Sequence, residues 1–162
     1  MKKIIVYHGT SYLFDEIDLN KSKDKRDFGK GFYTTTIVSQ AEAWARNISI
    51  RNGCECGYVY VYEFAFDSSL KIKEFLGLNE EWLDFIKLNR VQGGVQHNFD
   101  VVIGPVANDN TMLTVNRYIN GVYDAEEALK RLAYFKVNDQ VCLNTAKALE
   151  FIKLQRRHKV DL

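Results

Sequence analysis

Apolar and polar positions follow two different periods along this chain, and the changes between them predict its elements. Short runs rich in Val, Ile, Tyr and Phe, either alternating with polar residues or fully apolar, are typical of strands. Such runs predict strands over residues 4–7, 58–66, 70–72, 99–104 and 140–143. Apolar residues spaced three and four apart are typical of helices. This spacing predicts helices over residues 39–51, 78–89, 111–119, 124–135 and 145–153.

Capping residues support two of these helices. Ser39 and Glu42 have the spacing of a capping box, in which both side chains satisfy free N–H groups at a helix start. Asp124 and Glu127 have the same spacing. We expect an apolar inward face on each of the first two helices. The expected inward residues are Ala41, Trp44, Ala45 and Ile48 in the first, and Leu78, Trp82, Phe85 and Ile86 in the second.

The remaining segments are polar. Residues 11–30 include a charge cluster at 21–27 and predict a surface loop. The basic residues at 156–159 predict a frayed end. With one proline, no linker and no internal repeat, we expect one domain over residues 1–162 whose basic tail begins at about residue 154. Strands and helices mix without a regular βαβ order, which predicts the α+β class.

Composition narrows the class of protein without identifying it. The 162 residues have a formal net charge of +1, which gives no preference for a nucleic-acid partner. Three cysteines cannot form a closed disulfide framework and favour a reducing, cytoplasmic location. Cys54 and Cys56 lack a partner pair and His97 is isolated in its loop, so we expect no metal. No apolar stretch reaches about 18 residues, so no membrane span is expected.

Candidate chemistry begins where the first expected strand ends, in the segment His8-Gly9-Thr10. A histidine before a turn glycine is often structural. In the alternative, functional interpretation, the imidazole hydrogen-bonds a ligand hydroxyl. Gly9 would then let the backbone approach a planar amide, because a side chain there would clash.

A second candidate segment is Asp27-Phe28-Gly29-Lys30-Gly31-Phe32-Tyr33. Gly29 and Gly31 either serve a loop that needs positive φ or form a backbone ledge against a ligand. The run lacks the Gly-Lys-Ser/Thr ending of a Walker loop and the third glycine of a Rossmann fingerprint. Tyr33 and Trp44 could hold a flat ring between them, although a tryptophan on an inward helix face more often belongs to the core.

Together these residues resemble the NAD-binding core of the ADP-ribosyltransferase superfamily, in its diphtheria-toxin and poly(ADP-ribose) polymerase branch. The resemblance implies split antiparallel sheets around an NAD cleft, flanking helices, and a His–Tyr–Glu triad that binds and activates NAD. His8 matches the histidine of a His-Gly-Ser/Thr motif, and Tyr33 the tyrosine of a Phe-Gly-x-Gly-Ile/Phe-Tyr motif. Trp44 matches a second stacking aromatic. A serine that holds the nicotinamide amide in the polymerases falls on Ala41, so that contact is missing.

The resemblance is clear over residues 7–44 and softer over about 99–145. The chain also resembles a small bacterial family of uncharacterised, transferase-like proteins. The triad glutamate lies on a late strand, where this sequence has Gln140. Asp139 is adjacent, but neighbouring strand side chains point to opposite faces, and Glu150 on the next helix is a poor match.

The glutamine changes the expected chemistry. Cleavage of the nicotinamide–ribose bond builds positive charge, which a carboxylate about 4 Å away stabilises by up to ~4 kcal/mol at an effective dielectric near 20. That free energy corresponds to roughly a thousandfold in rate. Gln140 can still hydrogen-bond a ribose hydroxyl but carries no charge. The resemblance therefore implies slow transfer of a single ADP-ribose, without chain elongation.

Three functions remain open at this stage. The first is a mono-ADP-ribosyltransferase, with a protein acceptor favoured over a nucleic acid. The resemblance to bacterial members of this size suggests a toxin or effector, with an antitoxin-like partner. The second is a catalytically weak or inactive module that binds NAD or ADP-ribose, which the glutamine favours. The third is an NAD glycohydrolase, in which water replaces the acceptor.

Overall fold

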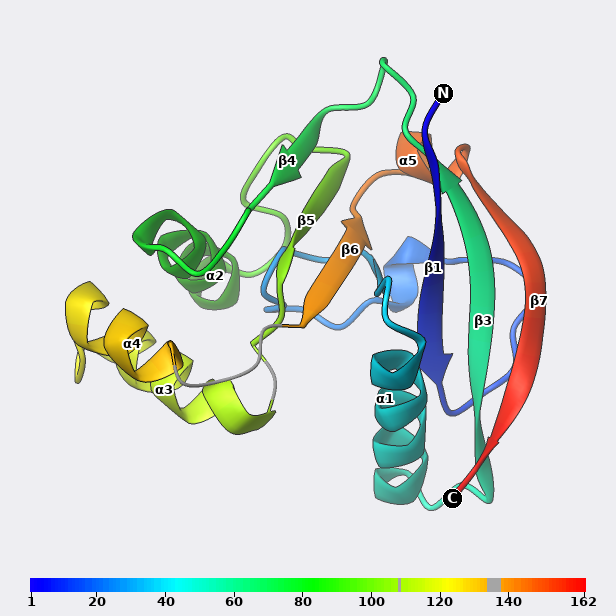
Figure 1. Cartoon of the computed structure of the whole chain (residues 1–162), viewed down its shortest axis with the longest axis horizontal. Coiled ribbons are helices and arrows are strands. Elements are labelled where there is room, and N and C mark those ends of the chain that lie inside the picture. The colour runs from blue at the N-terminus through cyan, green and yellow to red at the C-terminus, as the bar shows by residue number, and fades with distance from the viewer. Residues whose placement is uncertain (108, 134–137) are drawn as a thin grey trace.

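Two sheets joined by one short bridge form the framework of the protein (Figure 1). The computed structural model describes residues 1–107, 109–133 and 138–162. The first sheet has the order β1-β3-β7 and is antiparallel. The second has the order β2-β6-β5-β4, and only its β4–β5 pair is parallel. The strands are β1 (Lys3–Thr10), β2 (Phe32–Thr34), β3 (Cys56–Ala65), β4 (Ile72–Glu74), β5 (Val101–Pro105), β6 (Asp139–Leu143) and β7 (Ile152–Asp161).

Helices cover one face of each sheet, so the protein belongs to the α+β class, as predicted. α1 (Val38–Arg51) packs on β1 and β3 of the first sheet. α2 (Glu80–Gln92), α3 (Asp109–Ile119) and α4 (Ala125–Leu132) contact one another beside the second sheet (Figure 1). The described residues also form α5 (Ala146–Leu149) and the short 3-10 helix η1 (Leu19–Lys21).

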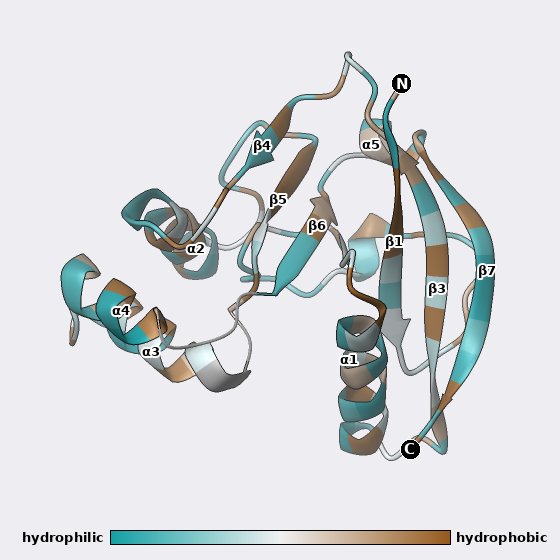
Figure 2. Ribbon diagram, in the orientation of Figure 1, coloured by the Kyte–Doolittle hydropathy of each residue, from teal (hydrophilic) through white to brown (hydrophobic). Residues whose placement is uncertain are grey.

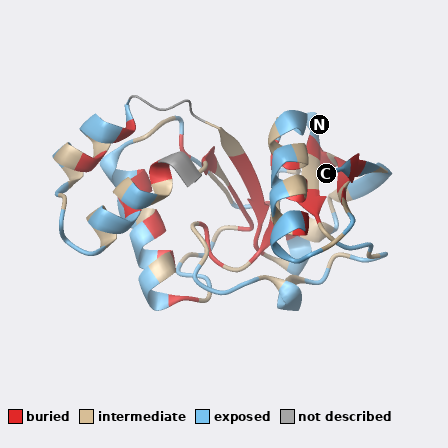
Figure 3. Ribbon diagram, turned by 90° about the horizontal axis from the view of Figure 1, so that it is seen from below, coloured by how far each residue is buried: buried red, intermediate tan, exposed pale blue. Residues whose placement is uncertain are grey.

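Three buried clusters hold these layers together, and buried residues follow the strands and the inward helix faces (Figure 3). The cluster under α1 includes Ala41, Ala45 and Val59. The cluster between the two sheets includes Val6, Phe32, Tyr60 and Val141. The cluster between the second sheet and its helices includes Phe28, Trp82, Val102 and Cys142. Alternate residues of β2 and β6 therefore enter different clusters, as the pleat of a strand requires.

Most predicted elements are confirmed, with bounds shifted by a few residues. Half of the capping box predicted for α4 is present, because the Asp124 side chain accepts a hydrogen bond from the N–H of Glu127. The Glu127 carboxylate instead accepts from Arg131 at 2.8 Å. Trp82 and Ile86 are buried as expected, whereas Phe85 and Leu78 pack at the edge of the core. The predicted end of α4 at Phe135 lies outside the described residues.

The predictions for α1 were wrong in two respects. The helix begins at Val38, and its N-cap residue Ile37 makes no side-chain cap hydrogen bond, so Ser39 and Glu42 form no capping box. Trp44 is 42% exposed, whereas Ala41 and Ala45 are buried. The reason is the close packing of α1 on the first sheet, which leaves room for alanines on the inward face and turns the large indole aside.

The C-terminal predictions were also wrong. α5 spans four residues, begins at the N-cap Thr145, and does not reach Lys153. The basic tail is not frayed but forms β7, which pairs with β3 along its length with one register shift at Val61/Tyr62. Figure 2 shows that the middle of β7 is hydrophilic. An edge strand with solvated charges lacks the apolar alternation by which strands are recognised, and charge on such an edge opposes further strand pairing.

Among the described residues, no helix is both long enough and apolar enough to cross a membrane.

Candidate functional site

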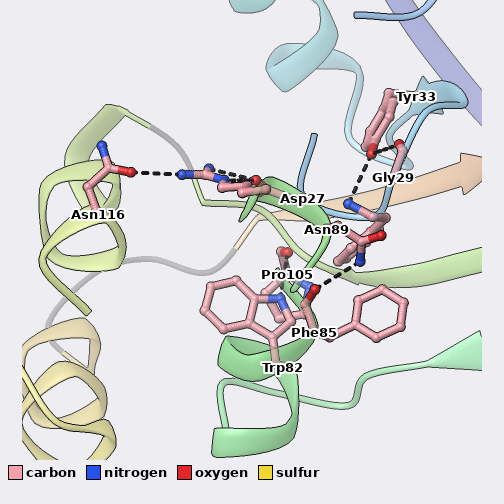
Figure 4. Close-up of polar contacts among 10 residues, drawn as sticks. Asp27, Gly29, Tyr33, Trp82, Phe85, Asn89, Pro105 and Asn116 are labelled. Carbon is pink, nitrogen blue, oxygen red and sulfur yellow. Dashed lines mark hydrogen bonds and ion pairs between the residues drawn. The ribbon is translucent and has the colours of Figure 1, made fainter. Parts of the chain in front are cut away.

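The segment 27–31, which we call the glycine loop, is held by hydrogen bonds from several parts of the chain. Figure 4 shows the contacts of Tyr33 with Gly29 and the ion pair at Asp27. The Tyr33 hydroxyl donates to the carbonyl of Gly29 at 2.5 Å and accepts from the N–H of Phe28 at 3.0 Å. The Asn144 amide, just after β6, donates to the carbonyls of Phe28 and Lys30, both at 2.9 Å. The hydroxyl of Tyr33 is thus committed to positioning its own loop.

Two further side chains fix the same loop. His97 lies 2.8 Å from the Phe28 carbonyl through Nε2, while its Nδ1 accepts from the N–H of Phe99 at 3.1 Å. These partners require a neutral ring protonated on Nε2, and burial lowers the pKa of His97. Arg90 of α2 holds Asp27 through Nε and Nη2, each 2.6 Å from Oδ1. The loop is therefore tied to β6, to α2 and to the chain before β5.

The protein's own packing explains the glycines of this loop. Gly29 has a φ of +85°, a conformation that favours glycine. A Cβ on Gly31 would lie 2.6 Å from Sγ of Cys142 and 2.8 Å from the carbonyl oxygen of Leu143. β2 therefore approaches β6 too closely for any side chain at Gly31. The predicted ligand ledge at these glycines stays a prediction.

The two sheets separate immediately beyond a single bridge between Tyr7 and Thr35. Tyr7 donates to Thr35 at 2.8 Å and accepts from it at 2.9 Å, so both of its backbone groups point away from β3. In an antiparallel strand alternate residues point to the same edge, so the N–H and C=O of Gly9 face the same side as those of Tyr7. Neither group of Gly9 finds a hydrogen-bond partner among the described residues, although Gly9 is buried.

The side of Gly9 that a side chain would occupy faces α1. A Cβ there would lie 2.2 Å from the carbonyl oxygen of Ala41 and 3.0 Å from the amide nitrogen of Ala45. The glycine is thus required by the contact between α1 and β1, and its free backbone groups lie at the strand edge. Thr10 is buried and accepts a hydrogen bond from the N–H of Tyr12 at 3.4 Å, where β1 ends.

His8 spans the separation between the sheets. Its Nδ1 lies 2.7 Å from the backbone carbonyl of Tyr33, and its ring stacks on Phe32 with centroids 4.3 Å apart. Burial lowers the pKa of His8 to about 4, so the ring is neutral at pH 7. A carbonyl accepts hydrogen bonds only, so Nδ1 carries the proton and Nε2 is an acceptor. No hydrogen bond to Nε2 is formed within the described part of the chain.

The structure brings His8 and Tyr33 together through the Tyr33 backbone and not through the two rings. Phe32 and Tyr33 are neighbours in β2 and point to opposite faces. The His8 ring lies with Phe32 in the cluster between the sheets, whereas the Tyr33 ring packs on the helix side with Cys142. Burial raises the pKa of Tyr33 well above its ordinary value and that of Cys142 to about 12, so neither group ionises near pH 7.

Gln140 is on the same face of the second sheet as Tyr33. It lies two residues before Cys142, which is the partner of Tyr33 in the β2–β6 pair. Gln140 is only 7% exposed, and its Nε2 has no hydrogen-bond partner among the described residues. A buried amide without a partner costs free energy, so its retention calls for an explanation. Asp139 differs, because its carboxylate accepts from both Thr35 and Thr36.

Trp44 lies on the flank of α1 that faces the separation between the sheets. Residues four apart share a helix face, and Gln40 donates through Nε2 to the carbonyl of Asp139 at 2.7 Å. The opposite flank meets β7, where Glu42 lies 3.8 Å from His158 and Arg46 donates to Asp161. Trp44 therefore points to the β6 side of α1. The structure shows no ring contact between Trp44 and Tyr33 in its described residues.

Three residues of this region were missed by the sequence reasoning. Gln40 orients the start of β6, and its own Oε1 is buried without a partner among the residues described. Asn144 anchors the glycine loop. Arg26 is half-buried, and its guanidinium carbon lies 4.4 Å from the centre of the Tyr33 ring. The only available signal was position: Gln40 lies one turn before Trp44, and Arg26 just before the glycine loop.

No group of three or more His, Cys, Asp or Glu residues that could hold a metal is present in the described ranges. A family model with the description "Protein of unknown function (DUF3990)" matches residues 4–154, which include every element from β1 to α5. Among curated proteins nothing matches the chain, and among solved structures nothing matches it either.

Proposed function

The chain belongs to the DUF3990 family, and we propose that it binds NAD where β1 and β2 separate and transfers a single ADP-ribose to an acceptor. The observation that carries this proposal is the free pair of backbone groups on Gly9. Nearly all buried backbone groups in proteins are hydrogen-bonded. A buried strand edge with a free N–H and a free C=O on one residue is therefore a strong indication of a ligand.

A carboxamide is the natural partner for such an edge. Its carbonyl accepts from the N–H of Gly9, and its NH₂ donates to the C=O, in the manner of a short added strand. The nicotinamide ring of NAD carries this group. Each such hydrogen bond contributes about 0.5–1.5 kcal/mol, and the pair fixes the orientation of the ring.

The exposed indole of Trp44 supplies a stacking surface beside this edge. Stacking on an aromatic ring adds about 0.5–1.5 kcal/mol beyond the area buried. Tyr33 would face the ring from the other side, with its hydroxyl already held by the glycine loop. His8, neutral and with a free Nε2, is suited to accept a hydrogen bond from a ribose hydroxyl.

Gln140 determines how fast such a site could work. Its Nε2 is enclosed by the protein, so it can hydrogen-bond a ribose hydroxyl after a rotation of the side chain, and it brings no negative charge to the developing cation. The carboxylate of Asp139 is occupied by Thr35 and Thr36. The proposed activity is therefore slow and stops after one ADP-ribose. The resemblance to bacterial transferases of this size, and not a feature of this site, favours a protein acceptor and a toxin or effector role.

The same residue favours a second candidate function, a module that binds NAD or ADP-ribose without turnover. Gln140→Glu separates the two, because a carboxylate there should accelerate a weak transferase by up to about a thousandfold. Release of nicotinamide from labelled NAD measures this. Free ADP-ribose formed without any acceptor would identify a glycohydrolase instead.

Tryptophan fluorescence tests binding itself. Trp44 is exposed and Trp82 fully buried, so a stacked nicotinamide should quench the emission of Trp44 alone. Trp44→Phe should remove the quenching yet keep NAD affinity within about twofold, whereas Trp44→Ala should weaken it about two- to tenfold. Ile50→Ala, at an exposed position of the same helix, is the matched control. Unquenched emission, together with no heat of binding for NAD, would refute the proposal.

A further inference from the structure

Arg26 is a charged side chain beside the candidate site, and it has no anionic partner among the residues that the structure describes. Its guanidinium lies over the Tyr33 ring at 4.4 Å, a cation–π contact, and the residue is half-buried. No hydrogen bond or ion pair joins its guanidinium to another residue that the structure describes. A partly buried cation normally acquires an anion, because desolvation without one is costly.

Two carboxylates of this region, those of Asp27 and Asp139, are held by other groups. Asp27, the next residue, is held by Arg90 through two contacts of 2.6 Å. Asp139 is held by Thr35 and Thr36. Neither carboxylate is therefore free to form an ion pair with Arg26.

The backbone at Arg26 is well placed. Its carbonyl accepts from the N–H of Gly29 at 3.0 Å, which starts the turn of the glycine loop. The Tyr33 ring beneath its guanidinium is fixed by two hydrogen bonds to the same loop. The charge also acts across the separation between the sheets, since it contributes, after burial, to the lowered pKa of His8. The cation thus lies over the Tyr33 ring and within electrostatic reach of His8, the residue proposed to contact the ribose.

We propose that Arg26 binds a phosphate group of the dinucleotide. This inference rests on the proposed function and assigns the anionic part of the same ligand. A guanidinium offers five donors in a planar fork, which matches two phosphate oxygens at once. Because Arg26 lies on the ring of Tyr33, phosphate and nicotinamide would be bound by neighbouring side chains on either side of the glycine loop.

Three probes separate this role from simple packing on the ring: NAD, ADP-ribose and free nicotinamide. In Arg26→Gln, which keeps most of the stem, we expect NAD and ADP-ribose to bind about ten- to a hundredfold more weakly. Nicotinamide, which has no phosphate, should bind within twofold of wild type. Arg26→Lys should retain part of the affinity, and added NaCl should weaken NAD binding less in Arg26→Gln than in wild type.

Arg51 provides the matched control, because its guanidinium lies over the other candidate ring, Trp44, at 5.9 Å. Arg51→Gln should leave ADP-ribose binding unchanged. Equal weakening of all three probes in Arg26→Gln, or no weakening of any, would overturn the assignment while the proposed function stands. A wild-type protein that binds none of the three would overturn the proposed function and this inference together. Thermal melting of each variant establishes that the comparison concerns folded protein.

Discussion

The glycine loop and the separation between β1 and β2 lie side by side, yet their polar groups are treated in opposite ways. In the loop, carbonyls and N–H groups are matched by Tyr33, Asn144 and His97. At the separation, the backbone of Gly9 and the Nε2 of Gln140 have no partners among the described residues. On the loop side the one such atom is Oδ1 of Asn144, whose Nδ2 makes two hydrogen bonds.

We interpret this contrast as a division between groups that stabilise the fold and groups that are available to a ligand. Buried polar groups are expensive unless paired, so a fold retains unpaired ones where another molecule completes them. The loop is the rigid support, because its hydrogen bonds reach β6, α2 and the segment before β5. The separation is the surface where, in the proposed function, a carboxamide and a ribose bind beside this support.

The largest expected effect on stability comes from replacing, one at a time, an amide side chain from each region with leucine. Asn144→Leu removes two hydrogen bonds to buried carbonyls, so it should lower the free energy of unfolding by about 2–4 kcal/mol. Gln140→Leu removes an amide whose Nε2 has no partner, so it should change stability by less than about 1 kcal/mol. Urea denaturation measures both. Equal destabilisation by the two changes would end the distinction between the regions.

Acid provides the next largest effect. His8 binds its proton near pH 4 in the folded protein, against an ordinary value of 6.5 in the unfolded chain. Between these values the unfolded state binds more protons, so stability falls as the pH falls and is fully present only above about 6.5. The loss by pH 4 is on the order of 3 kcal/mol.

The matched variant for this titration is His8→Phe, which keeps a ring against Phe32. Urea denaturation of wild type and variant at about pH 7, 5.5 and 4.5 gives the free energy of unfolding of each. The carboxylates titrate in both proteins, so the difference between the two isolates the contribution of His8. As the pH falls, the free energy of unfolding of His8→Phe should rise steadily relative to that of the wild type. A difference independent of pH would show that His8 titrates normally and is not held neutral.

The smallest effect sharpens the role of Tyr33. Tyr33→Phe removes the hydroxyl that joins Gly29 and Phe28 but keeps the ring, so we expect a loss of about 1–2 kcal/mol in stability. Affinity for NAD should stay within about twofold. If the variant is fully folded and yet loses much more affinity than this, the hydroxyl itself must contact the ligand.

Much of the fold could be predicted because local pattern and tertiary packing agree there. β3 is rich in Val and Tyr, and α4 carries its own cap at Asp124. β7 could not be predicted, because its charged residues are solvated on an edge and its pairing with β3 is set by distant chain. The exposure of Trp44 likewise depends on how closely α1 approaches β1, which Gly9 decides.

The sequence names the residues of the candidate site, which stay a prediction, but it does not show how they are arranged. His8, Tyr33 and Gln140 were named from motif positions. The His8 and Tyr33 rings lie on opposite faces, because side chains alternate along a strand and the Tyr7–Thr35 bridge fixes how β1 and the end of β2 are aligned. Arg26, Gln40 and Asn144 act through contacts between segments far apart in sequence, so no local pattern marks them.

The most direct test of the account is a crystal structure of the protein soaked with nicotinamide. We expect the carboxamide to hydrogen-bond both the N–H and the C=O of Gly9, with the ring against Trp44. A nicotinamide bound elsewhere, or a Gly9 whose two backbone groups are paired by the protein itself, would contradict the central claim.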